Sequence, residues 1–295
     1  MQNVVPVQLS QVRDFGQLIS TTFVFLKQNW KPLARAIAVV CLPFAVIGGF
    51  LSGGTMAGFQ ELQLTQPDDP FAALNALGTG MLFAIPGFLL LMFGYLLLIS
   101  MVHEYLRAYH LGEHHMMTPG ELAKRGWSQM GSYFGAGFLM GLIIVVGFVL
   151  CILPGLYAWT VLSLSMMAHA IERTGGSGSL GRSNNLVKAD FWPTLGLLIV
   201  IGLISGMLNF IIQLPFTIVG MVVGFNTALE TAQGNVPGFP TWYGTFMSIA
   251  TAIQWCGQML LYPIMAVCMG LKYFSRVEET EGLGLRRKMQ GFEQA

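Results

Sequence analysis

Two long uncharged runs constrain this chain more than any other feature of its sequence. Residues 71–102 contain no Asp, Glu, Lys or Arg in 32 positions, and residues 131–171 contain none in 41. Crossing the hydrocarbon core of a bilayer takes roughly 20 apolar residues. The second run is long enough for two crossings, and Pro154-Gly155 in its middle is typical of a turn. The sequence therefore predicts a multi-pass membrane protein.

The overall composition supports the same class. Only 10% of the residues are charged and 54% are hydrophobic, whereas an ordinary soluble domain carries about 25% charged residues. Such a chain cannot cover its surface with charge, so lipid must cover much of it. The net charge is +1, which gives no basic patch of the kind that binds nucleic acid. We therefore expect no nucleic-acid partner.

Apolar segments predict an all-α fold with six transmembrane helices, forming a single membrane domain over residues 1–295. The six expected spans are 33–53, 81–102, 132–153, 156–171, 194–223 and 242–273. The last two exceed the thickness of a bilayer, so we expect them to tilt or to extend beyond it.

The distribution of basic residues predicts the orientation. All 15 lie before span one or at its start, between spans two and three, between spans four and five, or at the end of span six and after it. The other three loops contain only acidic charges: Glu61, Asp68, Asp69 and Glu230. Because cytoplasmic loops are enriched in Lys and Arg, both termini are expected in the cytoplasm.

A short amphipathic helix is expected to lie in the membrane plane before each odd-numbered span. Each ends in a Lys and a Trp, and these two residue types anchor helices at the headgroup level. The first has an apolar stripe at spacings of three and four; the second begins with the capping box Thr118-Pro119-Gly120-Glu121; the third is capped by Ser177 or Ser179. The expected lipid-interface residues are Lys27, Trp30, Lys124, Trp127, Arg182, Lys188 and Trp192, and the apolar stripe of the first helix is Leu9, Val12, Phe15, Ile19, Phe23 and Leu26. The alternative is that these segments are cytosolic linkers that happen to be helical.

Each interfacial helix and the hairpin after it form one repeat unit. Spans two and four both end in Met-x-His-x-x-x-Arg, as Met101/His103/Arg107 and Met167/His169/Arg173, although span six has lost the His. We therefore expect three parallel repeats, over 8–107, 118–173 and 177–276, followed by a cytoplasmic tail at 277–295. Parallel repeats are related by an axis along the membrane normal.

The region 153–200 resembles the membrane domain of bacterial glycerophosphoryl diester phosphodiesterases and its standalone inner-membrane relatives. The matching residues are Leu153-Pro154-Gly155-Leu156-Tyr157, Glu172-Arg173, Ser179-Leu180, Arg182-Ser183, Leu186-Val187-Lys188 and Phe191-Trp192, with Arg276, Glu281-Gly282 and Leu285 in the tail. In that family, hydrolysis belongs to a separate soluble barrel. The sequence ends about twenty residues after its last span, so we expect that barrel to be absent. The resemblance then implies a membrane location without phosphodiester hydrolysis.

The histidines are the most chemically suggestive residues. His103, Arg107 and His110 share a helix face, and His169 belongs to the second motif, so these three histidines are candidate metal ligands. No HExxH pattern supports the metal site, and the simpler interpretation is a polar helix exit where His meets water and phosphates. An enzyme would need a cleft joining His103, Glu104, His169 and Glu172. We expect no cofactor and no catalytic site.

Four amides lie within the expected spans. Asn209 and Gln213 share a face of span five, and Gln254 and Gln258 share a face of span six. Intramembrane amides usually form hydrogen bonds between helices, and the alternative is that they line a polar permeation path. Glycines four residues apart favour close helix packing; the pairs are Gly49/Gly53, Gly131/Gly135, Gly137/Gly141, Gly202/Gly206 and Gly220/Gly224. The four cysteines are expected to be small buried hydrophobes.

These features favour a non-enzymatic membrane protein that scaffolds or organises the inner membrane. Its expected partners are membrane lipids, together with another protein or a second copy of the chain. The alternative function is a channel or transporter for a small molecule, and a lipid-derived substrate would fit.

Overall fold

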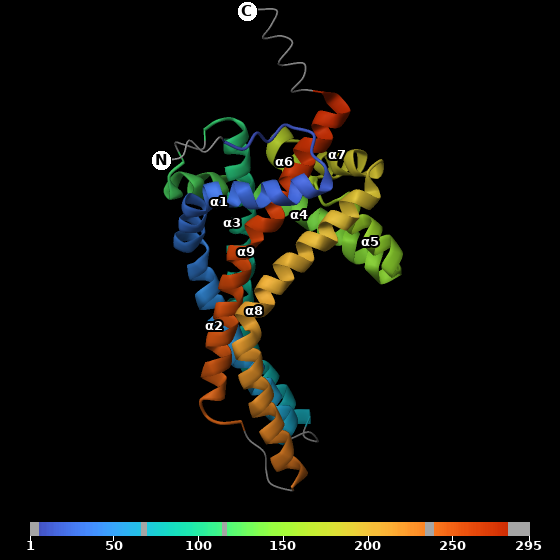
Figure 1. Ribbon diagram of the computed structural model, residues 1–295. Helices are drawn as coiled ribbons and strands as arrows, with labels where there is room; N and C mark the ends of the chain where they lie inside the picture. Colours follow the sequence, from blue (N-terminus) through green and yellow to red (C-terminus); the bar gives the residue numbers. More distant parts are fainter. Residues whose placement is uncertain (1–5, 66–69, 114–116, 234–238, 283–295) are drawn as a thin grey trace, which may run out of the picture. The chain divides into compact units, whose positions relative to one another are not determined.

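In the computed structural model of the chain, every regular element within residues 6–65, 70–113, 117–233 and 239–282 is an α-helix (Figure 1). These are the residues that the structure describes, with only the backbone described at 56–65, 70–79 and 231. The helices are α1 (Phe15–Val40), α2 (Leu42–Thr65), α3 (Pro70–His110), α4 (Pro119–Leu150), α5 (Ile152–Val161), α6 (Ser165–Glu172), α7 (Gly176–Lys188), α8 (Phe191–Ala232) and α9 (Tyr243–Glu281).

Among the residues that the structure describes, five segments are long and apolar enough to cross a membrane. They are Gly80–His110, Pro119–Leu150, Ile152–Glu172, Phe191–Glu230 and Tyr243–Glu281. A sixth is reached if α1 and the first part of α2 count as one broken span, bent by 48°. The multi-pass prediction is therefore confirmed at the level of five to six spans.

The expected interfacial helices differ from the observed elements. The first is the beginning of α1, which continues past Pro32 to Val40, and the second is the beginning of α4. Only the third is a separate helix, α7. Each helix end leaves backbone groups without partners. One continuous helix in place of an interfacial helix and a separate span therefore avoids two such ends. The arrangement of six spans and three separate interfacial helices is thus not reproduced.

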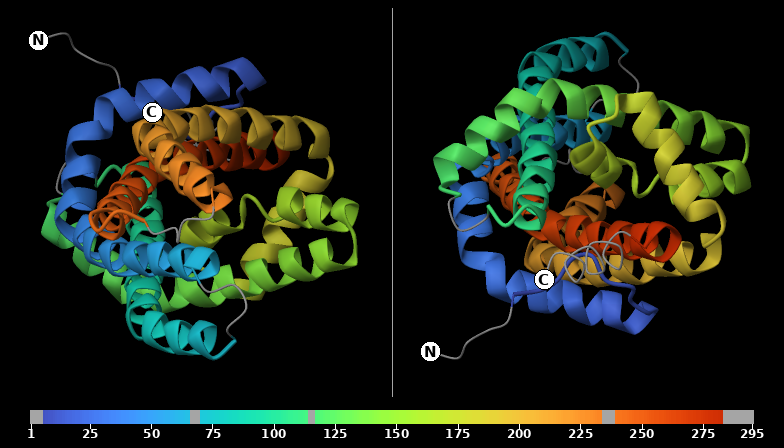
Figure 2. Two further views of the ribbon diagram at one scale, coloured as in Figure 1. Left: turned by 90° about the horizontal axis from the view of Figure 1, so that it is seen from below. Right: turned by 90° about the horizontal axis from the view of Figure 1, so that it is seen from above.

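The chain packs as two compact units assembled from distant segments. Unit 1 comprises residues 1–36, 96–205 and 262–295, and unit 2 comprises 37–95 and 206–261. In unit 1, α4, α5, α6 and α7 pack against one another, and both views of Figure 2 show them as green and yellow neighbours. The boundaries of the expected repeats do not coincide with these units, and the threefold repeat remains a prediction.

The buried face of α1 matches only part of the stripe that periodicity singled out. Leu9, just before α1, and Leu26 of that stripe are buried, but Phe15 and Phe23 are each 41% exposed. Beside Leu26, α1 buries Leu18, Thr22, Phe25, Asn29 and Leu33. Asn29 belongs there because its amide donates to the Phe25 carbonyl and its Oδ1 accepts a 2.9 Å hydrogen bond from the Tyr105 hydroxyl. This helix is therefore apolar on two faces, and protein covers only one of them.

The apolar stripe of α7 also packs against protein. Leu180, Ser183 and Val187 are buried. The Ser183 hydroxyl donates to the Val161 carbonyl at 2.7 Å and accepts from the Leu164 amide at 3.1 Å. These two bonds satisfy backbone groups where α5 ends and α6 begins. Helix α7 thus stabilises the connection between α5 and α6.

One of the two capping predictions is confirmed and the other is wrong. At the start of α4, the Thr118 hydroxyl accepts from the Glu121 amide, and the Glu121 carboxylate accepts from the Thr118 amide, as a capping box requires. At α7, however, the N-cap is Gly175 and no side chain caps the helix. Ser179 lies too far inside and donates to the Gly176 carbonyl instead.

Glycine packing in unit 2 involves one of the expected pairs. A Cβ added at Gly49 would lie 2.6 Å from the Ala252 Cα, and one at Gly53 would lie 2.6 Å from the Met247 carbonyl oxygen, so α2 approaches α9 closely. By contrast, Gly131, Gly135, Gly141, Gly202, Gly206 and Gly224 have no such neighbour within 4 Å among the described residues. The close-packing prediction is therefore wrong for most of the pairs. The cysteine prediction fails at Cys151, which is exposed.

Candidate functional site

The two Met-x-His-x-x-x-Arg motifs converge on one buried carboxylate in unit 1. Glu104 of α3 is 2% exposed. Its Oε2 lies 2.7 Å from Nη2 of Arg173, the last residue of the second motif, and 3.8 Å from Nη1 of Arg107, the last residue of the first. Its Oε1 accepts a 3.0 Å hydrogen bond from the Tyr133 hydroxyl of α4. One side chain thus connects α3, α4 and the end of α6.

Arg173 adopts an unusual backbone conformation at this point. Its φ of 53° lies in the left-handed region, where it terminates α6. That conformation costs a non-glycine residue about 1–2 kcal/mol. The guanidinium offsets this cost, because it also donates to Gln129 Oε1 at 2.8 Å.

The two motif histidines are buried rather than open to water. His103 Nδ1 is 2.8 Å from the Ile99 carbonyl oxygen, and His169 Nδ1 is 3.0 Å from that of Thr174. A carbonyl oxygen only accepts, so Nδ1 carries the proton in both rings. In the neutral ring Nε2 is then an acceptor, and Ser132 Oγ lies 2.9 Å from Nε2 of His169. The prediction that these histidines meet water and phosphates is therefore wrong.

Neither the candidate metal ligands nor the four candidate enzyme residues come together at one place. His110 stacks on Phe274 with ring centroids 4.7 Å apart. Among the residues that the structure describes, no group of three or more His, Cys, Asp or Glu side chains is arranged to hold a metal ion. Of the four residues that an enzyme would need, His103, Glu104 and His169 gather around Tyr133, but Glu172 belongs to a different cluster.

That second cluster occupies the other side of α6 and the end of α9. Arg182 Nε donates to Glu172 Oε1 at 2.6 Å, and its Nη2 pairs with Glu281. The Tyr273 hydroxyl donates to the same Glu172 oxygen at 2.7 Å. Burial alone would lower the pKa of Arg182, but the hydrogen bonds and charges of Glu172 and Glu281 outweigh it and raise the pKa. Arg182 was expected at the lipid surface, and the structure instead gives it two carboxylate partners.

A third cluster was missed by sequence reasoning. Asp190, between α7 and α8, forms an ion pair with Lys272 and lies 3.9 Å from Arg276 Nε. The Thr194 hydroxyl donates to the same carboxylate at 3.1 Å. Lys272 was interpreted as a topology signal, and Arg276 as a topology signal and a residue of the family resemblance. Their spacing of four within an apolar segment puts them on one helix face, and this could have indicated burial.

The six Lys and Trp anchors are all exposed. Trp30, Trp127 and Trp192 are 40%, 60% and 77% exposed, and Lys27, Lys124 and Lys188 are exposed as well. Large apolar rings in contact with water are unusual on a soluble protein surface, whereas tryptophan is enriched at membrane interfaces. These six side chains are therefore available to lipid.

Of the intramembrane amides, only Asn209 is constrained by its neighbours. Its Oδ1 is buried and has no hydrogen-bond partner in the part of the chain that the structure describes. The expected bond to another helix is thus not formed at this oxygen. Gln213 and Gln254 are half-buried and Gln258 is exposed. These amides line neither the cavity bounded by His110, Glu172 and Arg182 in unit 1 nor the crevice of unit 2 between α8 and α9.

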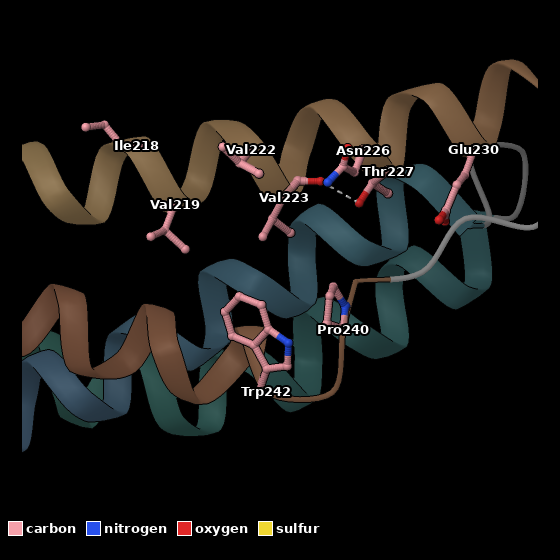
Figure 3. A pocket seen from close by; sticks show the side chains of 9 residues that line it. All are labelled: Ile218, Val219, Val222, Val223, Asn226, Thr227, Glu230, Pro240 and Trp242. Atoms are coloured by element: carbon pink, nitrogen blue, oxygen red, sulfur yellow. Dashed lines mark hydrogen bonds between the residues drawn. The ribbon is translucent and has the colours of Figure 1, made fainter.

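Unit 2 contains a crevice between the last turns of α8 and the start of α9, which we call the α8–α9 crevice. Its volume is about 460 Å³. Figure 3 shows its α8 side chains on one side and those of Pro240 and Trp242 on the other. The lining residues are Ile218, Val219, Val222, Val223, Asn226, Thr227, Glu230, Pro240 and Trp242.

The base of the α8–α9 crevice is packed. Val223 and Tyr243 are buried against Val219, Phe239, Phe246 and Met247. The Thr227 hydroxyl donates to the Val223 carbonyl at 2.9 Å. The mouth is open, because Val222 is 55% and Trp242 49% exposed. The sequence contained a signal for this crevice that was not used. Glu230, the one charged residue of the lining, follows the apolar residues Ile218 and Val222 on the same helix face.

Fold and composition together define a multi-pass α-helical membrane protein. No family model, curated protein or solved structure matches the chain. The resemblance in 153–200 therefore rests on the residues quoted above.

Proposed function

We propose that this chain is a non-enzymatic protein of the bacterial inner membrane that organises the bilayer by binding lipids. Both termini would face the cytoplasm, as the distribution of basic residues predicts. The observation that carries the proposal is the exposure of all six Lys and Trp anchors on three separate segments.

The pairing of the other charges supports this assignment. Arg173, Arg182 and Lys272 each contact a carboxylate within unit 1. The exposed anchor lysines are better placed to meet phosphate groups of lipid. A basic residue next to an anionic leaflet gains about 1 kcal/mol, so three anchors would hold several anionic lipids around the protein.

Removing the anchor charges should remove the lipid preference. We expect the triple variant K27A/K124A/K188A to bind phosphatidylglycerol about fivefold more weakly at each of the three anchors, since each lysine contributes about 1 kcal/mol. The measurement is native mass spectrometry of the full-length protein titrated with that lipid. The control K27R/K124R/K188R keeps the charges and should keep the binding. Equal binding by the wild type and the alanine variant would contradict the proposal.

The second candidate function, transport of a small molecule, is favoured by one observation, the unpartnered Asn209 oxygen. A polar group at membrane depth is a functional candidate because its burial is costly. If Asn209 has no transport role, Asn209→Leu should raise the free energy of unfolding by about 1–3 kcal/mol, since it removes an unsatisfied buried group.

Gln258→Leu, at an exposed amide of α9, is the control and should change stability little. Unfolding in a denaturing detergent measures both variants, and solute flux into proteoliposomes is measured alongside. A destabilised N209L variant that also loses a flux present in the wild type would favour transport.

A further inference from the structure

We propose that the α8–α9 crevice binds a phospholipid whose headgroup carries a primary ammonium group. This inference deepens the lipid-binding function proposed above and rests on it. It concerns the last turns of α8, at the opposite end of that helix from Trp192. None of the anchor residues lines the crevice.

The lining changes from apolar to polar along α8. Ile218, Val222, Asn226 and Glu230 succeed one another at intervals of four residues, over about 18 Å of helix. Residues four apart lie on one helix face, and Figure 3 shows these side chains following the crevice in that order. A phospholipid has the same gradient, from acyl chain through phosphate to headgroup. The acyl chain would lie against Ile218 and Val222.

The charge of the lining selects the headgroup. Glu230 is the single charged residue among the nine that line the crevice, and none of them is basic. A headgroup that carries only negative charge would be repelled by this carboxylate. An ammonium group would be attracted and could donate hydrogen bonds to it.

The spacing of the polar residues fits a headgroup with two opposite charges. Asn226 precedes Glu230 by one turn, about 5–6 Å along the helix. An amide N–H of Asn226 can donate to a phosphate oxygen while the Glu230 carboxylate accepts from the ammonium. A two-carbon linker between phosphate and ammonium spans a comparable length. Phosphatidylethanolamine has this arrangement.

Trp242 forms the wall of the crevice on the α9 side. Its ring lies across from the α8 side chains in Figure 3, and its flat apolar face suits an acyl chain near the headgroup level. Beneath it, the buried Val223 and Tyr243 keep the base filled. A lipid would therefore enter from the open side rather than pass through.

The test titrates the full-length protein in detergent with phosphatidylethanolamine and phosphatidylglycerol of identical acyl chains, read by native mass spectrometry. We expect Glu230→Gln to weaken phosphatidylethanolamine binding about two- to fivefold, the range for one exposed charge pair. It should not weaken phosphatidylglycerol binding. Val222→Trp fills the crevice and should abolish the phosphatidylethanolamine preference. Its matched control, Met221→Trp, changes the neighbouring exposed residue outside the lining and should keep the preference.

Two further arms distinguish the outcomes. K27A/K124A/K188A should retain the phosphatidylethanolamine preference while losing phosphatidylglycerol, so failure of the anchor proposal and failure of this one are separable. Free phosphoethanolamine should not compete, because it lacks the acyl chain. The inference is overturned if K27A/K124A/K188A, whose anchors no longer compete with phosphatidylglycerol, shows no preference for phosphatidylethanolamine, or if E230Q and V222W, each made in that background, both leave the preference unchanged. If V222W is unfolded, the E230Q result alone decides.

Discussion

Replacing Glu104 by alanine is expected to destabilise unit 1 by about 3–5 kcal/mol, the cost of removing one partner from a buried charge network. The carboxylate is 2% exposed and is held by Arg173, Arg107 and Tyr133. Without it, two guanidinium groups lose their partner, and the Tyr133 hydroxyl loses its acceptor. Arg173 also loses its ion pair with Glu104, which helps to offset the cost of its left-handed backbone conformation. The free energy of unfolding in a denaturing detergent is the quantity to measure.

The matched control is Glu113→Ala. Glu113 also pairs with an arginine, at 2.9 Å from Arg125, but both side chains are more than 40% exposed. Exposed pairs contribute only about 0–1 kcal/mol. Similar losses at Glu104 and Glu113 would show that Glu104 is not the connection between α3, α4 and α6.

Hydropathy predicted the membrane class and the approximate spans because this property is local. Whether a segment is apolar enough to lie in lipid depends only on the residues of that segment. The segment 194–223 was expected as a span, and α8 contains it. The same reasoning found the capping box at Thr118, since its two bonds lie within four residues.

Residues that meet across the fold were not predictable in this way. Glu104 and Arg173 are 69 positions apart, and nothing in either motif indicates that both arginines share one carboxylate. Arg182 was assigned to lipid because a basic residue before a span usually faces phosphate. Its partners Glu172 and Glu281 come from α6 and α9, and pairing with a distant carboxylate leaves no local signal.

Periodicity also cannot tell protein from lipid as the cover of an apolar stripe. The stripe of α7 around Leu180 and Val187 is buried by protein, whereas Phe15 and Phe23 of α1 stay exposed. Both patterns recur at the spacings of three and four residues that are typical of one helix face. In a chain that is 54% hydrophobic, an amphipathic pattern therefore locates a helix but does not show whether protein or lipid covers its apolar face.

Glycine spacing has the same limitation, and one substitution made at two sites should show it. Gly49→Ala should destabilise unit 2 by about 1–3 kcal/mol, the usual cost of overpacking. The new Cβ would lie 2.6 Å from the Ala252 Cα, and because this is a backbone atom, α2 and α9 would have to move apart. Gly135→Ala should instead stabilise α4 by up to about 1 kcal/mol, because alanine favours a helix over glycine.

The Gly135 site has no neighbouring atom within 4 Å that a Cβ would meet. Both variants are compared with the wild type by unfolding in a denaturing detergent, so that the sign of the change is the readout. A loss of stability at Gly135 as large as at Gly49 would mean that this face of α4 is covered in the membrane, by lipid packing or by a second copy of the chain. The opposite signs expected here follow from the distance to the nearest backbone, since both glycines sit in the same small-residue spacing.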